Sequence, residues 1–331
     1  MRAGPGRATI YDVAARAGVS ISTVSLVVNA PHRVRAETRE RVVVAAGELG
    51  YRMRGGRQRG VPSIAVAAPF TSYPSYLRRL SGMLSAARGA AVDIVPYDLD
   101  SAAAAVSPLV ETLPMRSGAS GLVVMGVPLG NTARRAARVA GFPVGYVDIE
   151  PGRHAPRGPV VLVDDRHGGA RIGAHLASLG HRRVAFLHEP QRSGAYVSAG
   201  MLRAEGLGEH VEVRAHAARD PVTVDADTVR AVLADGATAI VASHDSLAAA
   251  AVTTCRTVEG AARLAVVGYD DGELARALDL TTVRQPFEES GRVALHHLLM
   301  MVADPAPAPE TVVLEPELIV RSSSRPPEPA A

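Results

Sequence analysis

Residues 9–29 of this 331-residue chain read TIYDVAARAGVSISTVSLVVN, and this stretch decides the fold of the N-terminal part. Thr9 can cap a helix from Ile10 to Arg16, and Gly18 ends that helix. Ser20 then stands where a second N-cap is expected, before a helix over residues 21–28. Two short helices separated by an Ala-Gly-Val-Ser turn predict a helix-turn-helix.

A third helix is expected from about Ala36 to Leu49, with Gly50 as its end. Three short helices can form a bundle for protein contacts or a module that binds DNA. Charge distinguishes the two. Residues 1–60 hold eleven arginines and four acidic residues, whereas the remaining residues hold 25 arginines and 29 acidic residues. A basic head on a mildly acidic body favours binding of a polyanion.

The residues of this head resemble the DNA-binding headpiece of the lac repressor (LacI/GalR) family of transcription regulators. The resemblance is carried without a gap by Thr9–Ala14, Ala17–Ser20, Thr23–Ser25, Asn29, Thr38–Val42 and Leu49–Tyr51. It implies that residues 20–28 lie in the major groove as a recognition helix. The positions implied to contact the DNA backbone are Thr9, Ser20, Thr23, Ser25 and Asn29. Those implied to read bases are Ile21, Ser22 and Leu26.

The head departs from the family pattern at two places. Leu26 stands where Arg is common; Leu can contact a thymine methyl but cannot hold guanine bidentately, so weaker demand for guanine is expected there. After Tyr51 the family usually carries a hinge helix, whereas residues 53–62 here read MRGGRQRGVP. Each interior Gly costs a helix about 1 kcal/mol, so a short basic linker is expected, with Arg54 and Arg57 following phosphates.

From Ser63 onward, apolar strand candidates alternate with helical stretches, which is typical of parallel sheets covered on both faces. The strand candidates are Ile64–Pro69, Val92–Tyr97, Gly121–Gly126, Pro143–Asp148, Val160–Asp164, Arg183–His188, Ala239–Ser243 and Leu264–Tyr269. Helices are expected over Tyr76–Arg88, Gly168–Leu179 and Ser246–Thr257. So many strands indicate two doubly wound lobes, divided in the Pro- and Gly-containing residues 150–159.

The family resemblance extends over this body, through motifs such as Val163–Asp165, Leu179–Arg183, Val266–Asp271 and Thr281–Pro286. The fold class expected is therefore an all-α helix-turn-helix head plus an α/β two-lobed, periplasmic-binding-protein-like effector domain with parallel sheets. The head would span residues 1–52, the linker 53–62, the effector and dimerisation domain 63–324, and a disordered tail 325–331. The lobes would be about 62–151 plus 287–304, and 152–286 plus 305–324.

Ligands of open parallel sheets bind beyond the carboxyl ends of the strands, so loop starts supply the candidate effector residues. They are Phe70, Ser72, Tyr73, Tyr76, Met125, Arg192, His244, Asp245 and Asp270. Asp270 matches a family effector contact, and His244 stands where the family usually has Asn. Asp245 and Asp270 could instead cap the helices that follow them. Aromatic residues are 4% and there is no Trp, so a sugar or another polar metabolite fits the sequence.

Other classes of protein are disfavoured. The single cysteine, Cys255, excludes an intramolecular disulfide, and the histidines show no zinc pattern, so neither metal nor cofactor is expected. No nucleophile elbow surrounds Ser246, and no enzyme is expected. No signal peptide or membrane-spanning run is present, which indicates a cytoplasmic protein. The sequence thus predicts a homodimeric, ligand-responsive repressor that binds operator DNA through its helix-turn-helix head. Effector binding in a cleft between the lobes is expected to control operator affinity. The alternatives are a ligand sensor with degenerate or nonspecific DNA binding and, less favoured, a solute-binding protein.

Overall fold

The computed structural model describes residues 8–52, 61–99, 108–116, 118–150, 156–189, 198–220, 222–305 and 308–326. The chain divides into two compact units. The first comprises Met1–Leu162 and Phe287–Val312, and the second Val163–Pro286 and Val313–Ala331. The head therefore groups with the first unit. The first boundary between the units follows Leu162, about eleven residues after the expected boundary near residue 151. Residues 327–331 of the expected tail lie outside the described residues.

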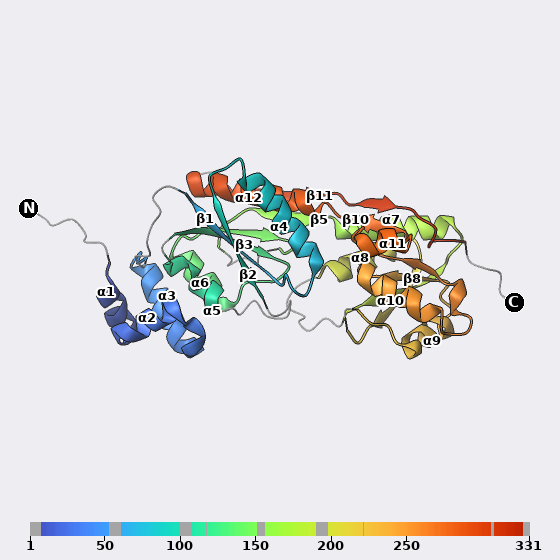
Figure 1. The fold of residues 1–331 in the computed structure, drawn as a ribbon, viewed down its shortest axis with the longest axis horizontal. Coiled ribbons are helices and arrows are strands. Elements are labelled where there is room, and N and C mark those ends of the chain that lie inside the picture. The colour runs from blue at the N-terminus through green and yellow to red at the C-terminus, as the bar shows by residue number, and fades with distance from the viewer. Residues whose placement is uncertain are drawn as a thin grey trace, which may run out of the picture. The chain divides into compact units, whose positions relative to one another are not determined.

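The head consists of the three predicted helices, drawn in blue in Figure 1: α1 (Ile10–Ala17), α2 (Ile21–Asn29) and α3 (Ala36–Glu48). Thr9 and Asp12 form a capping box that starts α1, and Gly18 ends it with a φ of 64°. Ser20 caps α2, as predicted. A short 3-10 turn, η1 (Pro31–Arg33), joins α2 to α3. Fully buried Val13, Val24 and Val42 come from the three helices and form the centre of the head's core.

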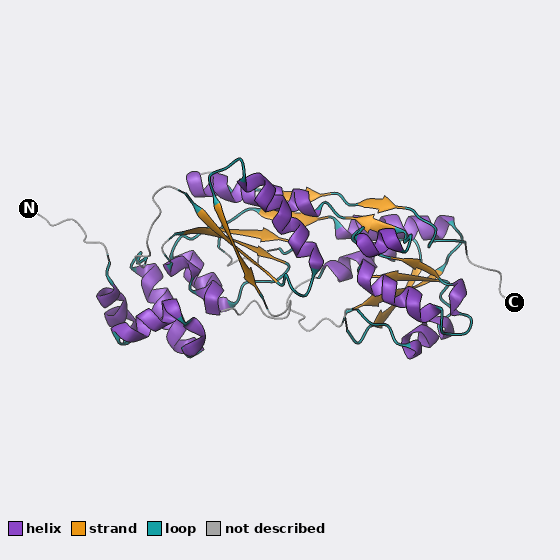
Figure 2. Ribbon diagram, in the orientation of Figure 1, coloured by secondary structure: helices purple, strands orange, loops and turns teal. Residues whose placement is uncertain are grey.

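A six-stranded sheet in the order β11-β5-β4-β3-β1-β2 runs through the body of the first unit (Figure 2). Its strands are β1 (Ser63–Ala68), β2 (Asp93–Asp98), β3 (Ala119–Met125), β4 (Val144–Val147), β5 (Val160–Val163) and β11 (Thr311–Leu314). The helical segments are α4 (Pro74–Ala87), α5 (Pro108–Glu111), η2 (Leu113–Met115), α6 (Asn131–Val139) and α12 (Phe287–Ala303). Strands β1 to β5 pair in parallel, as predicted.

The second unit contains a four-stranded parallel sheet in the order β7-β6-β8-β9. Its strands are β6 (Arg183–His188), β7 (Glu212–Ala217), β8 (Ala239–Ala242) and β9 (Ala265–Val267). Its helical segments are α7 (Asp165–Ser178), α8 (Ala199–Leu207), α9 (Ala226–Ala234), α10 (Asp245–Cys255), η3 (Ala261–Arg263) and α11 (Glu273–Ala277). Strands β10 (Thr282–Arg284) and β12 (Glu317–Ile319) form a separate antiparallel pair.

All eight predicted strands are present, but the pattern missed β7, β10, β11 and β12. The missed strands alternate exposed and partly buried residues or are only three residues long, so they lack the continuous apolar run that identified the others. Within the described ranges, no single helix is long and apolar enough to cross a membrane; α1 and α2 pass that test only jointly, as a pair bent by 103°. Those same residues contain no group of three side chains placed to hold a metal ion.

Candidate DNA interface and effector residues

The start of α2 is fixed by hydroxyl groups. Ser20 Oγ accepts a hydrogen bond from the Thr23 backbone N–H at 3.2 Å, and it lies 2.8 Å from both Ser22 Oγ and Thr23 Oγ1. At the other end of the helix, Asn29 Nδ2 donates to Ser25 Oγ at 3.2 Å. Hydroxyl and amide groups of this kind are common contacts to phosphate oxygens.

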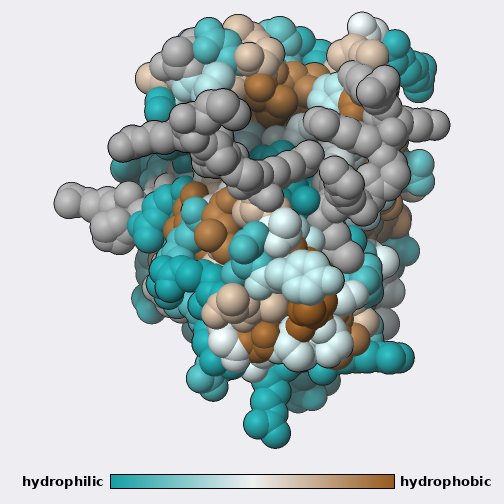
Figure 3. Space-filling model, turned by 90° about the vertical axis from the view of Figure 1, so that its left-hand side faces the viewer, coloured by the Kyte–Doolittle hydropathy of each residue, from teal (hydrophilic) through white to brown (hydrophobic). Residues whose placement is uncertain are grey.

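The two faces of α2 differ sharply in burial. Val24, Val27 and Val28 are buried in the head, whereas Ile21 is 41% exposed and Leu26 is 38% exposed. Ser22 and Asn29 are also exposed, and Thr23 and Ser25 are partly buried. The predicted base-reading side chains therefore share the outer face of one helix, where a DNA groove could receive them. Figure 3 shows hydrophobic residues, in brown, among hydrophilic ones on one face of the molecule.

Two further side chains at the start of α1 are exposed and are candidates for the same interface. Thr9 is exposed at the N-terminus of α1, where its hydroxyl donates a hydrogen bond to the Asp12 carboxylate at 2.6 Å. Tyr11, which the sequence analysis did not assign to DNA, is 66% exposed on the same helix. Tyr11 lies in the first turn of α1, next to the predicted DNA contact Thr9, and this position was the signal available in the sequence. Arg54 and Arg57 lie outside the described residues.

In the first unit, the predicted effector residues gather at the carboxyl ends of β1 and β3. The Thr71 hydroxyl and backbone N–H both donate to the Asp98 carboxylate, which ties the loop after β1 to the end of β2. Within that loop Phe70 is buried and Ser72 is exposed. Tyr73 and Tyr76 make an edge-to-face contact with ring centroids 6.1 Å apart.

Tyr76 also connects this loop with β3. Its hydroxyl lies over Gly126, where any side chain would collide with it, and Gly126 has a φ of 66°. The preceding Met125 is fully buried, so its side chain supports this edge of the sheet from within and does not reach solvent in this structure.

Sequence reasoning missed a buried arginine beside these residues. Arg79 on α4 is 2% exposed, pairs with Asp148 at the end of β4, and lies 4.3 Å from the ring centroid of Phe287 and 5.4 Å from that of Tyr76. Asp148 has a φ of 57°, an uncommon backbone conformation for a residue other than Gly. The sequence signal for Arg79 was weak: it is an arginine on the inward face of an amphipathic helix.

In the second unit, Asp245 is tied to its own fold. Its carboxylate accepts hydrogen bonds from the Gly272 backbone N–H and from Thr282 Oγ1, each at 2.7 Å, and it is 5% exposed. Burial, reinforced by the negative charge of Asp270, raises the pKa of Asp245 to about 7. Asp245 does not cap α10, because the N-cap is His244, whose Nδ1 accepts from the Leu247 N–H at 3.3 Å.

His244 and Asp270 are held at neighbouring strand ends. His244 Nε2 lies 2.9 Å from Oε1 of Glu189, a residue just after β6 that the sequence analysis did not select. The Asp270 carboxylate accepts from Gln285 Nε2 at 2.6 Å, and its φ is 117°. It caps no helix, since Gly272 begins α11. The carboxylates of Glu189 and Asp270 could accept hydrogen bonds from ligand hydroxyls, whereas both ring nitrogens of His244 already have partners in the protein.

A second buried arginine was also missed. Arg203 on α8 stacks over the Tyr269 ring at 3.8 Å, donates from Nε to Asp165 Oδ1 at 2.7 Å, and donates from Nη1 to the Ser243 carbonyl at 2.5 Å. It therefore fixes the residues that flank His244 and Asp270. Arg192, the arginine chosen from the sequence, lies outside the described residues.

Comparison with known proteins agrees with this division into head and α/β body. Residues 9–53 match the family of bacterial regulatory proteins called the lacI family, and residues 174–324 match the periplasmic binding protein-like domain. The chain is 32% identical, over 97% of its length and 95% of the relative's, to an uncharacterised HTH-type transcriptional regulator in the aml 5′ region of Streptomyces limosus. It is 28% identical to the lactose operon repressor of Escherichia coli over 88% of this chain and 84% of the repressor.

Two solved structures extend the likeness to three dimensions. A complex of the transcriptional regulator CelR with cellobiose is similar with a TM-score of 0.67 and 27% identity, covering 96% of this chain and 100% of that one. The lac repressor dimer bound to operator and the anti-inducer ONPF is similar with a TM-score of 0.64 and 25% identity, covering 96% and 99%.

The fold and the outer face of α2 define a helix-turn-helix transcriptional regulator with a ligand-sensing domain. The chain belongs to the lacI family of bacterial transcriptional regulators.

Proposed function

We propose that this regulator acts as a homodimeric repressor, with its two heads on the half-sites of a pseudo-palindromic operator and with effector binding altering operator affinity. The observation that carries the proposal is the outer face of α2, where Ile21, Ser22 and Leu26 are exposed above a buried valine face. Two-fold symmetry of protein and operator would then match. Because the proposed partner is chromosomal DNA, the proposed place of action is the cytoplasm. The proposal also assigns this chain a binding function and no enzymatic one.

Binding-site selection from a random duplex library, using the full chain, tests specific DNA recognition. The selected duplex and a scrambled duplex of equal composition are then titrated across a salt series. We expect both affinities to fall with salt, while the selected duplex keeps an advantage of about 10³-fold or more. Equal affinity for the two duplexes at every salt concentration would leave only phosphate contacts and reject the proposal.

We further propose a neutral polyhydroxy compound as the effector. Taking each unit by itself, the predicted contacts are Tyr73 in the first unit and His244 and Asp270 in the second. Glu189 and Asp270 are carboxylates at the strand ends of the second unit, which disfavours anionic ligands. The related CelR binds cellobiose. Ser72, Tyr76 and Arg192 are further predicted contacts in this proposal. Phe70 and Met125 are buried and would support the strand ends from within.

A thermal-shift screen tests the effector class with cellobiose, ribose and other neutral sugars, sugar phosphates, and purine nucleosides as the compared sets. A ligand at 100 times its Kd should stabilise the folded chain by about 2.7 kcal/mol. We expect the stabilising compounds to be neutral sugars. Stabilisation by sugar phosphates or purines alone would reject the proposed class without affecting the DNA-binding proposal.

A further inference from the structure

The head packs against the body of its own unit through apolar residues. Met115 of η2 and Ala136 of α6 belong to the same buried cluster as the core of the head. Helix α3 approaches α6 so closely that a Cβ on Gly47 would lie 3.4 Å from the Val139 Cβ. The core of the head is therefore completed by the body and is not closed by its three helices alone.

A buried ion pair lies within this contact. Arg39 Nε of α3 donates to Glu111 Oε2 of α5, and the two side chains are 6% and 3% exposed. Arg39 Nη1 also donates to the Val34 carbonyl at 2.9 Å and the Pro31 carbonyl at 3.3 Å, both in the turn after α2. Replacing Glu111 while the contact stays closed would leave the Arg39 guanidinium buried without its carboxylate partner, which carries a strong penalty for a buried charge.

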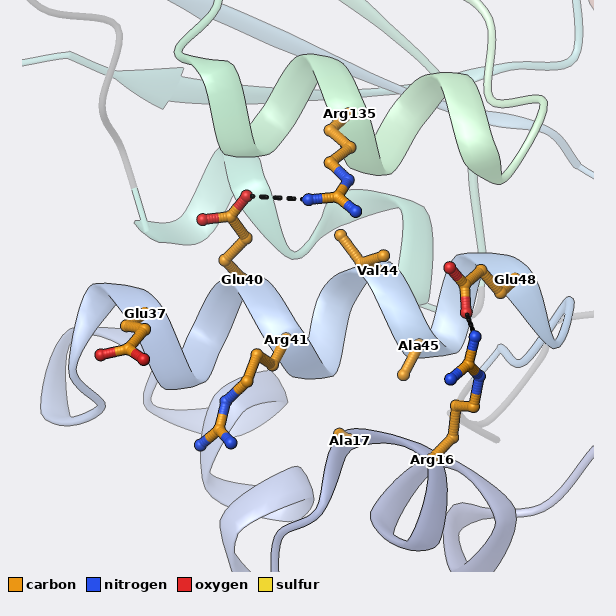
Figure 4. Close-up of a pocket in the computed structure, with 9 residues that line it drawn as sticks. All are labelled: Arg16, Ala17, Glu37, Glu40, Arg41, Val44, Ala45, Glu48 and Arg135. Carbon is orange, nitrogen blue, oxygen red and sulfur yellow. Dashed lines mark ion pairs between the residues drawn. The ribbon is translucent and has the colours of Figure 1, made fainter.

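The body also holds the end of the recognition helix. Arg116 Nη2, just after η2, donates to the Val28 carbonyl at 3.0 Å in the last turn of α2. Figure 4 shows the outer rim of the contact, where Glu40 of α3 points toward Arg135 of α6 across a groove of about 460 Å³. That rim pair is 3.6 Å apart and half exposed, so it is far weaker than the Arg39–Glu111 pair.

We propose that this docked contact, centred on Arg39 and Glu111, positions the recognition helix for DNA. Docking leaves the outer face of α2 exposed, which makes the docked head competent for DNA. This inference rests on the proposed function for its DNA readout, but the docking itself does not depend on it.

The docking elements also connect the head with the predicted effector residues of the first unit. Arg116 and η2 precede β3, and α6 follows it. The carboxyl end of β3 carries Met125 and Gly126, over which the Tyr76 hydroxyl lies. A shift of β3 on effector binding would therefore move both surfaces on which the head is docked.

Disulfide trapping in the full chain tests the docking without DNA or effector. The pair Gly47→Cys and Val139→Cys is chosen because the two Cβ atoms would be about 3.4 Å apart, close to the span of a disulfide. Oxidised glutathione supplies the oxidant, and the native Cys255 can stay because it is buried. We expect near-complete cross-linking, whereas the pair Tyr11→Cys and Val139→Cys, which joins α6 to the exposed Tyr11 position on α1 of the same unit, stays largely reduced. Equal rates for the two pairs would overturn the proposal.

Glu111→Gln in the same background tests the ion pair, and Glu40→Gln is its matched control. We expect Glu111→Gln to slow cross-linking by about tenfold or more and Glu40→Gln to change it by less than about twofold. Circular dichroism verifies that the helical content of each variant is retained. Equal effects of the two variants would overturn the role of Arg39 and Glu111.

DNA binding of the cross-linked chain provides the second readout. On the duplex obtained by selection, the cross-linked protein should bind within about fivefold of its reduced form, because the outer face of α2 stays open. A greater loss would show that the head must leave the body to bind DNA and would overturn the proposal. If no duplex is selected at all, the proposed function fails, while the cross-linking result still decides the docking.

Discussion

At the scale of single residues, we predict that Leu26 sets the sequence preference at one step of the proposed operator. Its side chain is 38% exposed on the outer face of α2 and offers no hydrogen-bond donor. Leu26→Arg should add a bidentate donor for guanine, worth about 1–3 kcal/mol of discrimination at that step. Parallel binding-site selection with both proteins measures it: guanine should rise at one position per half-site in the variant only. Unchanged preferences would place Leu26 outside base contact.

The raised pKa of Asp245 predicts that the free energy of unfolding falls as pH rises. Its pKa is raised from an ordinary value of 3.8 to about 7, so the folded chain keeps a proton that the unfolded chain loses above about pH 4. Its contribution to the free energy of unfolding should therefore fall as pH rises from about 4 to 7, by at most about 1.4 kcal/mol per pH unit. Asp245→Asn removes the titration. Denaturant unfolding of both proteins at pH 5–8 measures the difference, and parallel curves would contradict the assignment.

The same residue marks the limit of sequence inference at this scale. Asp245 follows a buried strand and so was a reasonable ligand contact, yet its carboxylate is occupied by Gly272 and Thr282. Sequence reasoning did not select Glu189 and Arg203, because neither stands in a local pattern that indicates a ligand contact. Their partners, His244 and Asp165, are distant in sequence, and no local pattern indicates which side chains the fold brings together.

At the scale of elements, each unit contains a close crossing of two helices at a glycine, beside a buried arginine. In the first, α4 and α12 cross so closely that a Cβ on Gly291 would collide with the Arg79 carbonyl. In the second, α7 and α8 cross with Gly169 against the Arg203 carbonyl. The two arginines then pair with Asp148 and Asp165. Glycine at each crossing permits backbone contact, and the arginine beside it is fixed next to predicted effector residues.

Gly169→Ala tests the close crossing in the second unit. The new methyl group must push α8 away from α7, so we expect a loss of about 1–3 kcal/mol in the free energy of unfolding. Weaker binding of any effector found by the thermal-shift screen should accompany it, because Arg203 moves with α8. Gly200→Ala is the control on α8, since its nearest neighbour is 3.9 Å away. Denaturant unfolding that ranks the two variants equally would refute the close-crossing argument.

The helices of the head could be predicted from the sequence because capping residues mark where they begin and end. Thr9, Gly18 and Ser20 define the boundaries of the head helices, and each has the capping or left-handed geometry that its position suggested. The antiparallel pair β10–β12 had no such signal. Its three residue pairs join segments more than thirty positions apart, and tertiary contacts determine their pairing.

At the scale of the whole molecule, the proposed homodimer needs an apolar surface on each chain. Helix α4 supplies one candidate, since Leu77 and Leu84 are 52% and 46% exposed and, seven residues apart, lie on one face of the helix. Large apolar side chains exposed in this way are typical of association surfaces when they form a patch. We predict that Leu77 and Leu84 become buried against the partner.

Leu84→Glu should therefore place a charge in the dimer interface and shift the protein toward monomer. Sedimentation equilibrium across a range of concentrations measures this shift, and titration of the selected duplex measures the accompanying loss of affinity, because one head binds only one half-site. Met201→Glu is the control: Met201 is 51% exposed on α8, and its substitution should leave the dimer intact. If Leu84→Glu remains dimeric while Met201→Glu dissociates, the association surface lies on the second unit and α4 is excluded.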